Sequence, residues 1–255
     1  MGDRVTFDST IYCGQCPYCL RGEVNLCDNR QVLGVSCGDY SRQGAFAEYV
    51  SVPARVLCRI PDNITYQQAA MVEPVSVAVH GIDRAHIGPG DRVAIIGTGM
   101  IGLLALQVAN AARPDELIAV DIDPRKRQAA LDLGATQALE SADGLDLDAA
   151  IEAVGITATV SMAIKSVRKG GRVALIGNLE PTVQIPLQVL VTREISLYGC
   201  CASQGDYEES LSLISSGEVK VDSMISETIT LEQAPEYFER LHSGKSGLMK
   251  VIVCP

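Results

Sequence analysis

Long apolar runs and a charged leader are both missing from this sequence of 255 residues. Its longest apolar stretches, such as residues 100–106, fall well short of the roughly 20 residues that a membrane-spanning helix requires. No positively charged start followed by an apolar segment opens the chain. We therefore expect neither a membrane partner nor a secretory leader.

Positive charge is also scarce. Lys and Arg together number 21, against 31 Asp and Glu, which gives a formal net charge of −10. An acidic surface repels phosphate backbones, so nucleic acid is not expected as a partner. The hydrophobic fraction of 47% excludes a disordered chain and predicts one large or two modest globular domains.

Cysteine, in contrast, is abundant, with nine residues. An odd number of cysteines without a leader argues against paired disulfides and indicates a reducing compartment, so we expect a cytoplasmic protein. Four of the nine, Cys13, Cys16, Cys19 and Cys27, lie within 15 residues that also contain turn-forming Gly and Pro. Four thiolates form a closed cage for Zn²⁺ with no position for a substrate, so this loop predicts a structural zinc site.

Two alternatives to zinc compete for the cysteine loop. Iron–sulfur proteins also use closely spaced cysteines, but the bacterial ferredoxin run has three residues before its fourth cysteine, whereas this loop has seven. Unligated cysteine is the other alternative. It fits the five remaining cysteines better than the four in the loop; those five are Cys37, Cys58, Cys200, Cys201 and Cys254.

Hydrophobic patterning divides the chain into three parts. Residues 1–76 show short alternating runs, as in 45–50, which predict half-buried β-strands. Residues 77–203 alternate apolar runs with helical periods. The predicted strands are 92–96, 117–120, 137–139, 149–153, 172–176 and 195–198. Six strands with interleaved helices predict an α/β fold with a doubly wound parallel sheet. Residues 204–255 have no place in that sheet, and we expect them to return to the first domain.

A glycine motif follows the first of these strands. Gly97, Gly99 and Gly102 have the G-x-G-x-x-G spacing, and Asp121 ends the next strand. In this context the glycines permit a tight turn and a close approach of backbone to a pyrophosphate, and Asp121 can accept both ribose hydroxyls. The motif therefore predicts a dinucleotide site that prefers NAD to NADP. A strand–turn–helix that binds nothing remains the alternative, and the cations 125–127 weaken the preference for NAD.

Taken in order, these motifs resemble a known family. Residues 2–5, the cysteine loop, 44–50, Glu73-Pro74, the glycine turn, 170–173 and 250–253 resemble the zinc-dependent medium-chain alcohol and polyol dehydrogenases. The resemblance implies a GroES-like catalytic domain (1–76, completed by 204–255) and a Rossmann domain (77–203). It also implies hydride transfer between NAD and a secondary alcohol, such as a polyol, a sugar alcohol or a sugar phosphate, which a catalytic zinc polarises.

The same resemblance assigns further site residues. Glu73 occupies the position where sorbitol-type enzymes contact the catalytic zinc, directly or through water, which makes it the candidate catalytic residue. Its alternative role is to favour a helix N-terminus through the helix dipole. Lys126 lies where polyol enzymes have a cofactor-contacting Arg, and Ile101 lies within the glycine motif, so both are candidate cofactor-binding residues.

The sequence also departs from the family. Family members begin earlier, and their upstream stretch carries a zinc-binding Cys, a Gly-His-Glu segment and the hydroxyl of a proton relay. The three histidines, His80, His86 and His242, do not match that motif. We therefore expect an incomplete active site. The alternative function is a truncated, non-catalytic NAD-binding protein that retains the structural zinc; a zinc-free reductase is disfavoured by the cysteine loop and Glu73.

The last predicted strand of the sheet, 195–198, is apolar. Apolar strands at the edge of a sheet are usually covered, so we expect a homodimer joined at this strand, or a homotetramer.

Overall fold

The computed structural model describes residues 2–35, 38, 41–244 and 247–255. The chain forms two compact units, and each is described here by itself. Unit 1 comprises Met1–Glu73 and Tyr207–Pro255, and unit 2 comprises Pro74–Asp206. Helix α3 (Val72–Arg84) continues through the boundary after Glu73.

Unit 2 contains a six-stranded sheet, as the alternating pattern predicts. The strands lie in the order β11-β10-β9-β6-β7-β8, and each neighbouring pair is parallel. This is the order of a doubly wound Rossmann sheet, so the predicted fold class is confirmed. The strands are β6 (Arg92–Ile96), β7 (Glu116–Val120), β8 (Gln137–Leu139), β9 (Leu147–Glu152), β10 (Val167–Leu175) and β11 (Ser196–Gly199).

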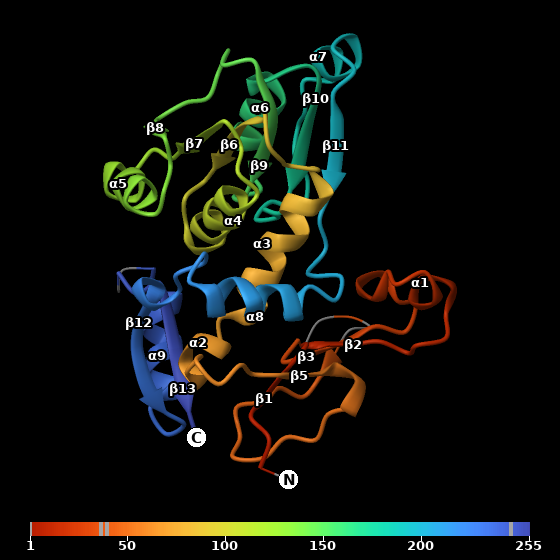
Figure 1. Ribbon diagram of the computed structural model, residues 1–255, viewed down its shortest axis with the longest axis vertical. Helices are drawn as coiled ribbons and strands as arrows, with labels where there is room; N and C mark the ends of the chain where they lie inside the picture. Colours follow the sequence, from red (N-terminus) through yellow and green to blue (C-terminus); the bar gives the residue numbers. More distant parts are fainter. Residues whose placement is uncertain (1, 36–37, 39–40, 245–246) are drawn as a thin grey trace. The chain divides into compact units, whose positions relative to one another are not determined.

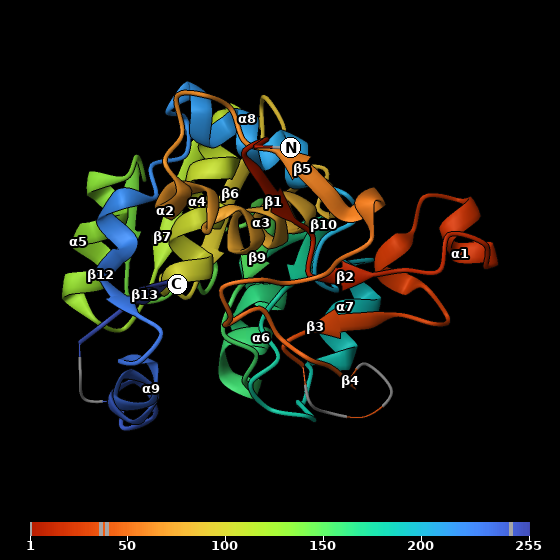
Figure 2. The ribbon, with the colours of Figure 1, turned by 90° about the horizontal axis from the view of Figure 1, so that it is seen from below.

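Helices pack against the strands of this sheet (Figures 1 and 2). Val160, Ala163 and Ile164 of one helix join β-strand residues in an apolar cluster, because their spacing places them on one helical face. Another helix begins after Asp123, whose side chain accepts from the backbone N–H of Arg125, with Pro124 in its first turn. These helices are α4 (Met100–Ala111), α5 (Pro124–Asp132), α6 (Thr157–Ser166) and α7 (Leu187–Thr192).

The strand β10 begins earlier than the apolar pattern predicts. It starts at Val167 rather than at residue 172, and its pairing with β9 shifts register between Val167 and Arg172. Gly170 has a positive φ of 69° within this stretch, a conformation that side chains other than glycine rarely adopt. This irregular pairing coincides with the polar and glycine residues at 168–171, where the apolar pattern is interrupted.

Unit 1 contains short strands in small sheets. Strand β1 pairs antiparallel with β5, β3 lies between β2 and β4, and β12 pairs parallel with β13. The tail 207–255 thus contributes its own strand pair to the unit that contains the start of the chain. The strands are β1 (Val5–Phe7), β2 (Thr10–Ile11), β3 (Gln31–Leu33), β4 (Ser41–Arg42), β5 (Leu57–Arg59), β12 (Ile225–Thr230) and β13 (Lys250–Cys254).

The helices of unit 1 are short apart from those of the tail. Thr65 caps one of them reciprocally with Gln68, so that each side chain accepts from the other residue's backbone N–H. The α-helices are α1 (Pro17–Leu20), α2 (Tyr66–Ala69), α8 (Tyr207–Ser216) and α9 (Ala234–His242), and 3₁₀ turns occur at Val24–Leu26, Ala54–Val56 and Asp222–Met224.

The strand predicted at 45–50 is wrong. These residues lie in a segment without regular structure between β4 and the 3₁₀ turn at Ala54–Val56, and the backbone N–H of Ala47 donates locally to the carbonyl of Ala45. The Phe46 ring instead packs against Phe238 of α9, with ring centroids 5.9 Å apart. Alternation alone does not make a strand, because a strand also needs a neighbouring strand for its backbone hydrogen bonds.

The helices of the described residues are all too short or too polar to cross a membrane.

Candidate functional site

The glycine motif forms the turn between β6 and α4 in unit 2. Gly97 has a φ of 87°, and its backbone N–H donates to the carbonyl of Val120 at the end of β7. A Cβ atom at Gly97 would lie closer than 3.0 Å to the side chain of Val154. Conformation and space therefore both require glycine at this position.

Gly102 and Gly99 have different constraints. A Cβ atom at Gly102 would lie closer than 3.0 Å to the carbonyl oxygen of Gly97, so helix α4 can approach the turn only because Gly102 has no side chain. A Cβ atom at Gly99 would have no other atom within 4 Å. Gly99 directly precedes α4, and no side chain caps this end of the helix. The first backbone N–H groups of α4 are thus available to an anion, as a pyrophosphate site requires.

Asp121 lies beside this turn. Its Oδ2 accepts from the backbone N–H and the hydroxyl of Thr98, at 2.9 and 3.3 Å, and its Oδ1 accepts from the backbone N–H of Asp123 at 2.9 Å. Lys126 Nζ lies 3.8 Å from the same Oδ2. The structure therefore brings together the glycine turn and the two predicted ribose-contacting residues, while Ile101 is half-buried in the first turn of α4.

The four loop cysteines converge in unit 1. The Sγ atoms of Cys13, Cys16, Cys19 and Cys27 all lie within 4.8 Å of one another, and those of Cys13 and Cys19 are 4.0 Å apart. Sulfurs on a tetrahedral Zn²⁺ with bonds of about 2.3 Å would be about 3.8 Å apart. The donor set and its spacing therefore fit a zinc ion with a closed ligand shell.

Backbone N–H groups point at these sulfurs. Gln15 and Cys16 donate to the Cys13 Sγ at 3.5 and 3.4 Å, and these hydrogen bonds lower the pKa of Cys13 to about 6. A hydrogen bond from the Cys19 backbone likewise lowers the pKa of Cys16, whereas burial raises that of Cys19 to about 12. Donors aimed at sulfur stabilise thiolates, the form that binds metal.

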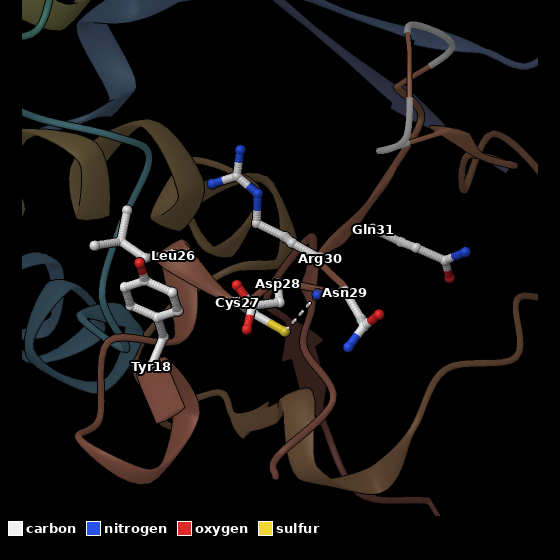
Figure 3. Close-up of a pocket in the computed structure, with 7 residues that line it drawn as sticks. All are labelled: Tyr18, Leu26, Cys27, Asp28, Asn29, Arg30 and Gln31. Carbon is white, nitrogen blue, oxygen red and sulfur yellow. Dashed lines mark hydrogen bonds between the residues drawn. The ribbon is translucent and has the colours of Figure 1, made fainter. Parts of the chain in front are cut away.

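A polar pocket of about 660 Å³ adjoins the cysteine cluster (Figure 3). Cys27 lies in its wall, where its Sγ accepts from the backbone N–H of Asn29 at 3.3 Å. All residues lining the pocket come from the lobe that carries the cysteines, namely Tyr18, Leu26, Cys27, Asp28, Asn29, Arg30 and Gln31. The pocket therefore belongs to the cysteine-bearing part of unit 1 and not to the glycine turn of unit 2.

Among the described residues, the other cysteines are not part of a cluster of metal ligands. Cys58, Cys200, Cys201 and Cys254 are half-buried, and Cys37 lies outside the described residues. The eight described cysteines form no disulfide with one another.

Glu73 lies in the first turn of α3, as the helix-dipole alternative requires. Its side chain is partly exposed, but the surrounding protein removes enough water from it to raise its pKa. The negative charge of Asp8 adds to this rise, and the positive charge of Lys250 opposes it. Burial, with the charges of Asp8 and Glu73, also raises the pKa of Tyr207. Asp8 and Tyr207 are thus neighbours of Glu73 that the sequence pattern did not identify.

Around Glu73, the residues that the structure describes form no set of zinc ligands. Within them, the four-cysteine cluster is the only group of three or more ligand atoms. His80 is buried in α3, with its Nδ1 3.7 Å from Asp206 Oδ2, so it is a paired residue of the core. His86 follows the last residue of α3 by two positions and His242 is the last residue of α9, so both lie near helix ends, as their positions in the sequence predict.

Comparisons with known proteins identify the family. The family model described as zinc-binding dehydrogenase matches residues 101–216, and that of the alcohol dehydrogenase GroES-like domain matches residues 1–62. Sorbitol dehydrogenase of Bacillus subtilis is 33% identical over all of this chain, which covers 75% of that protein. The chain belongs to the zinc-binding alcohol and polyol dehydrogenases.

Two further relatives agree with this assignment. D-xylulose reductase A of Aspergillus oryzae is 31% identical to this dehydrogenase. The matched region covers 96% of this chain and 72% of the Aspergillus protein. The crystal structure of a zinc-binding dehydrogenase from Sinorhizobium meliloti, bound to NADP, superposes with a TM-score of 0.88 at 32% identity, covering 100% of this chain and 77% of that one.

Family membership establishes the general chemistry. The dehydrogenase is an oxidoreductase that acts on an alcohol CH–OH group of a small molecule, and its cofactors are zinc and NAD(P). None of these comparisons favours the non-catalytic alternative.

The two glycines of the turn should respond differently to alanine. Gly102→Ala forces the Cβ against the backbone of Gly97 and should lower the free energy of unfolding by about 3 kcal/mol. Gly99→Ala has space for its Cβ and should cost about 1 kcal/mol or less. Urea unfolding of the two variants measures the difference, and equal losses would contradict the close contact at Gly102.

Proposed function

We propose that the dehydrogenase transfers hydride between NAD and a secondary alcohol of a polyol, a sugar alcohol or a sugar phosphate. The observation that carries this proposal is the open N-terminus of α4 beside Gly99, with Asp121 and Lys126 at its side. These groups suit the pyrophosphate and the adenosine ribose of a dinucleotide. The names of the sorbitol and xylulose relatives support a polyol as the substrate class.

The choice of NAD over NADP depends on Asp121. A carboxylate at this position accepts hydrogen bonds from ribose hydroxyls and repels a 2′-phosphate. Lys126 opposes that repulsion because its ammonium group lies 3.8 Å from the carboxylate. The NADP in the Sinorhizobium relative shows that 2′-phosphate is accepted within the family, so both cofactors belong in the test.

The four-cysteine loop is the proposed zinc site of unit 1. When bound there, zinc would link both ends of the 13–27 segment and stabilise a lobe whose helix α1 has only four residues. A closed shell of four thiolates leaves no position for an alcohol, so this metal is structural.

The role of Glu73 stays a prediction. Its place beside Asp8, Tyr207 and Lys250 is compatible with the candidate catalytic residue of unit 1, and equally with stabilisation of the N-terminus of α3. Unit 1 is the proposed GroES-like catalytic domain, and unit 2 is the proposed dinucleotide-binding domain. That the eight described cysteines form no disulfide with one another supports the proposed cytoplasmic location.

The edge of the sheet supports a homodimer, with a homotetramer as the alternative. In the described part of the chain, β11 pairs only with β10. Apolar side chains are exposed nearby, with Leu187 at 61% and Val191 at 64%. A second copy that pairs along β11 would satisfy the free backbone groups and cover these side chains.

Oxidation of a polyol tests the proposed function. With zinc present, the dehydrogenase should reduce NAD in the presence of sorbitol, xylitol or a sugar phosphate, measured by the absorbance of the reduced nicotinamide. Asp121→Ala should raise the dissociation constant of NADH about tenfold, because it removes a hydrogen-bond acceptor of the site. Asp121→Asn, which keeps one acceptor oxygen, is the matched control. The proposal fails if neither NAD nor NADP is reduced with any of these substrates.

Metal analysis tests the cysteine site. The purified chain should contain about one zinc in the four-cysteine loop, and Cys16→Ser should remove most of it because three thiolates no longer close the shell. Cys254→Ser lies outside the cluster and should keep the metal. Elemental analysis measures zinc per chain. Retention of zinc in Cys16→Ser would contradict this site, and about two zincs in the wild type would indicate a second site.

Sedimentation velocity tests the dimer. Val191→Glu places a charge among the exposed apolar side chains beside β11 and should convert the dimer to a monomer. Ile122→Glu is the matched control, since Ile122 is 82% exposed in the turn after β7. A wild-type chain that sediments as a monomer at micromolar concentration would refute the proposed dimer.

A further inference from the structure

Glu152 is a buried acid at the end of the central strand β9. It has no exposed surface, and its Oε1 accepts from the backbone N–H groups of Val154 and Gly155, at 3.0 and 2.8 Å. The carboxylate therefore folds back over the turn that follows its own strand. The two hydrogen bonds that this oxygen accepts fix the path of the chain through 153–155.

The second oxygen of Glu152 makes this residue unusual. Among the residues that the structure describes, its Oε2 has no hydrogen-bond partner. A buried polar atom without a partner costs free energy, and a carboxylate costs more than a neutral group. Stability alone thus does not explain an acid at this position, and such groups are common where function outweighs stability.

Glu152 lies at the edge of the sheet where a ligand is expected. Its neighbour on one side is Ile96, the last residue before the Gly97 turn, and on the other Leu175, the last residue of β10. The carbonyl of Glu152 accepts from the backbone N–H groups of Ile176 and Gly177, at 2.9 and 3.1 Å. In doubly wound sheets, ligands bind outside the carboxyl ends of the strands at the point where the strand order reverses, which here lies between β6 and β9.

The turn that Glu152 fixes is in close contact with both neighbouring turns. The Val154 side chain covers Gly97 so closely that a Cβ atom there would lie nearer than 3.0 Å. On the other side, Cβ atoms at Gly155 and Gly177 would each meet the backbone of the opposite turn within 3.0 Å. A shift of residues 153–155 would therefore displace the Gly97 turn or the start of the 177–179 loop.

We propose that Glu152 is a positioning residue for the dinucleotide. By holding the 153–155 turn in place, it keeps the Gly97 turn and the start of the 177–179 loop in the positions that receive the cofactor. This inference rests on the proposed dinucleotide site at the Gly97 turn. Glu152 contributes through the backbone and needs no contact with the cofactor itself.

Binding of NADH to four variants tests the proposal. Glu152→Ala leaves the N–H groups of Val154 and Gly155 without their acceptor and should raise the dissociation constant of NADH about tenfold. Glu152→Gln keeps one acceptor oxygen and should restore the affinity to within about threefold of the wild type. Glu152→Asp has a side chain that is too short by one methylene group and should lose about as much affinity as Glu152→Ala.

Ser166→Ala is the matched control for loss of a buried polar group. Ser166 is also fully buried in unit 2, and its hydroxyl donates to the carbonyl of Ala163 at the far end of α6 from the turn. It should lower the unfolding midpoint and leave the NADH affinity unchanged. For a substrate that is oxidised, Glu152→Ala should raise the KM for NAD and leave kcat within about twofold, a split that a merely structural role would not produce.

The outcomes separate this inference from the proposed function. Wild-type affinity in Glu152→Ala would overturn the positioning role while the dinucleotide site stands. If Glu152→Ala does not fold, Glu152→Asp decides: weakened binding supports the role, and wild-type affinity overturns it. Equal losses in Ser166→Ala and Glu152→Ala would also overturn it, because the effect would then be general destabilisation. A wild-type chain that binds neither NADH nor NADPH would refute the dinucleotide site itself.

Discussion

The contact between Gly102 and the carbonyl of Gly97 determines the geometry of the dinucleotide-binding unit. No side chain fits between these two residues, so α4 begins close to the end of β6. The first backbone N–H groups of α4 therefore lie at the edge of the sheet without a side-chain cap. Thr98, one residue into the same turn, connects it to Asp121 at the end of β7. Backbone packing thus establishes the position of the helix terminus, and charged side chains are arranged around it. Substitution at either glycine would change all of these positions together.

Local features of the sequence explain why most of unit 2 was predictable. Residues 93–96 of β6 are apolar and fully buried, as expected for a strand that is covered on both faces, and both β6 and β8 have the bounds predicted from the sequence. Asp123 is a helix cap and Pro124 a first-turn proline, and α5 begins at Pro124. The site is equally local. The Gly97 turn and Asp121 follow neighbouring strands, and the four cysteines lie in one loop, so spacing alone predicts that each set meets.

Features that depend on distant residues were not predictable in the same way. Phe46 has the alternation of a strand, but its partner is a ring on α9 that lies far along the chain. Asp8 and Tyr207 surround Glu73 only after the two segments of unit 1 come together. Glu152 reads in the sequence as the polar end of an apolar run, and its two hydrogen bonds to the following turn become visible only in three dimensions. Sequence patterns report periodicity and caps, whereas these contacts arise from tertiary packing.

The discontinuity of unit 1 has a consequence for the order of folding during synthesis. Its first segment, Met1–Glu73, leaves the ribosome before any of unit 2, but the β12–β13 pair that belongs to it is made last. Unit 2 is continuous and can fold as soon as Asp206 has emerged, since all of its sheet partners are then available. During that time the first segment of unit 1 lacks its packing partners in the tail 207–255. The cysteine loop does not depend on the tail, because its four ligands are close together in the sequence. Metal binding there can order part of the first segment before the tail is synthesised.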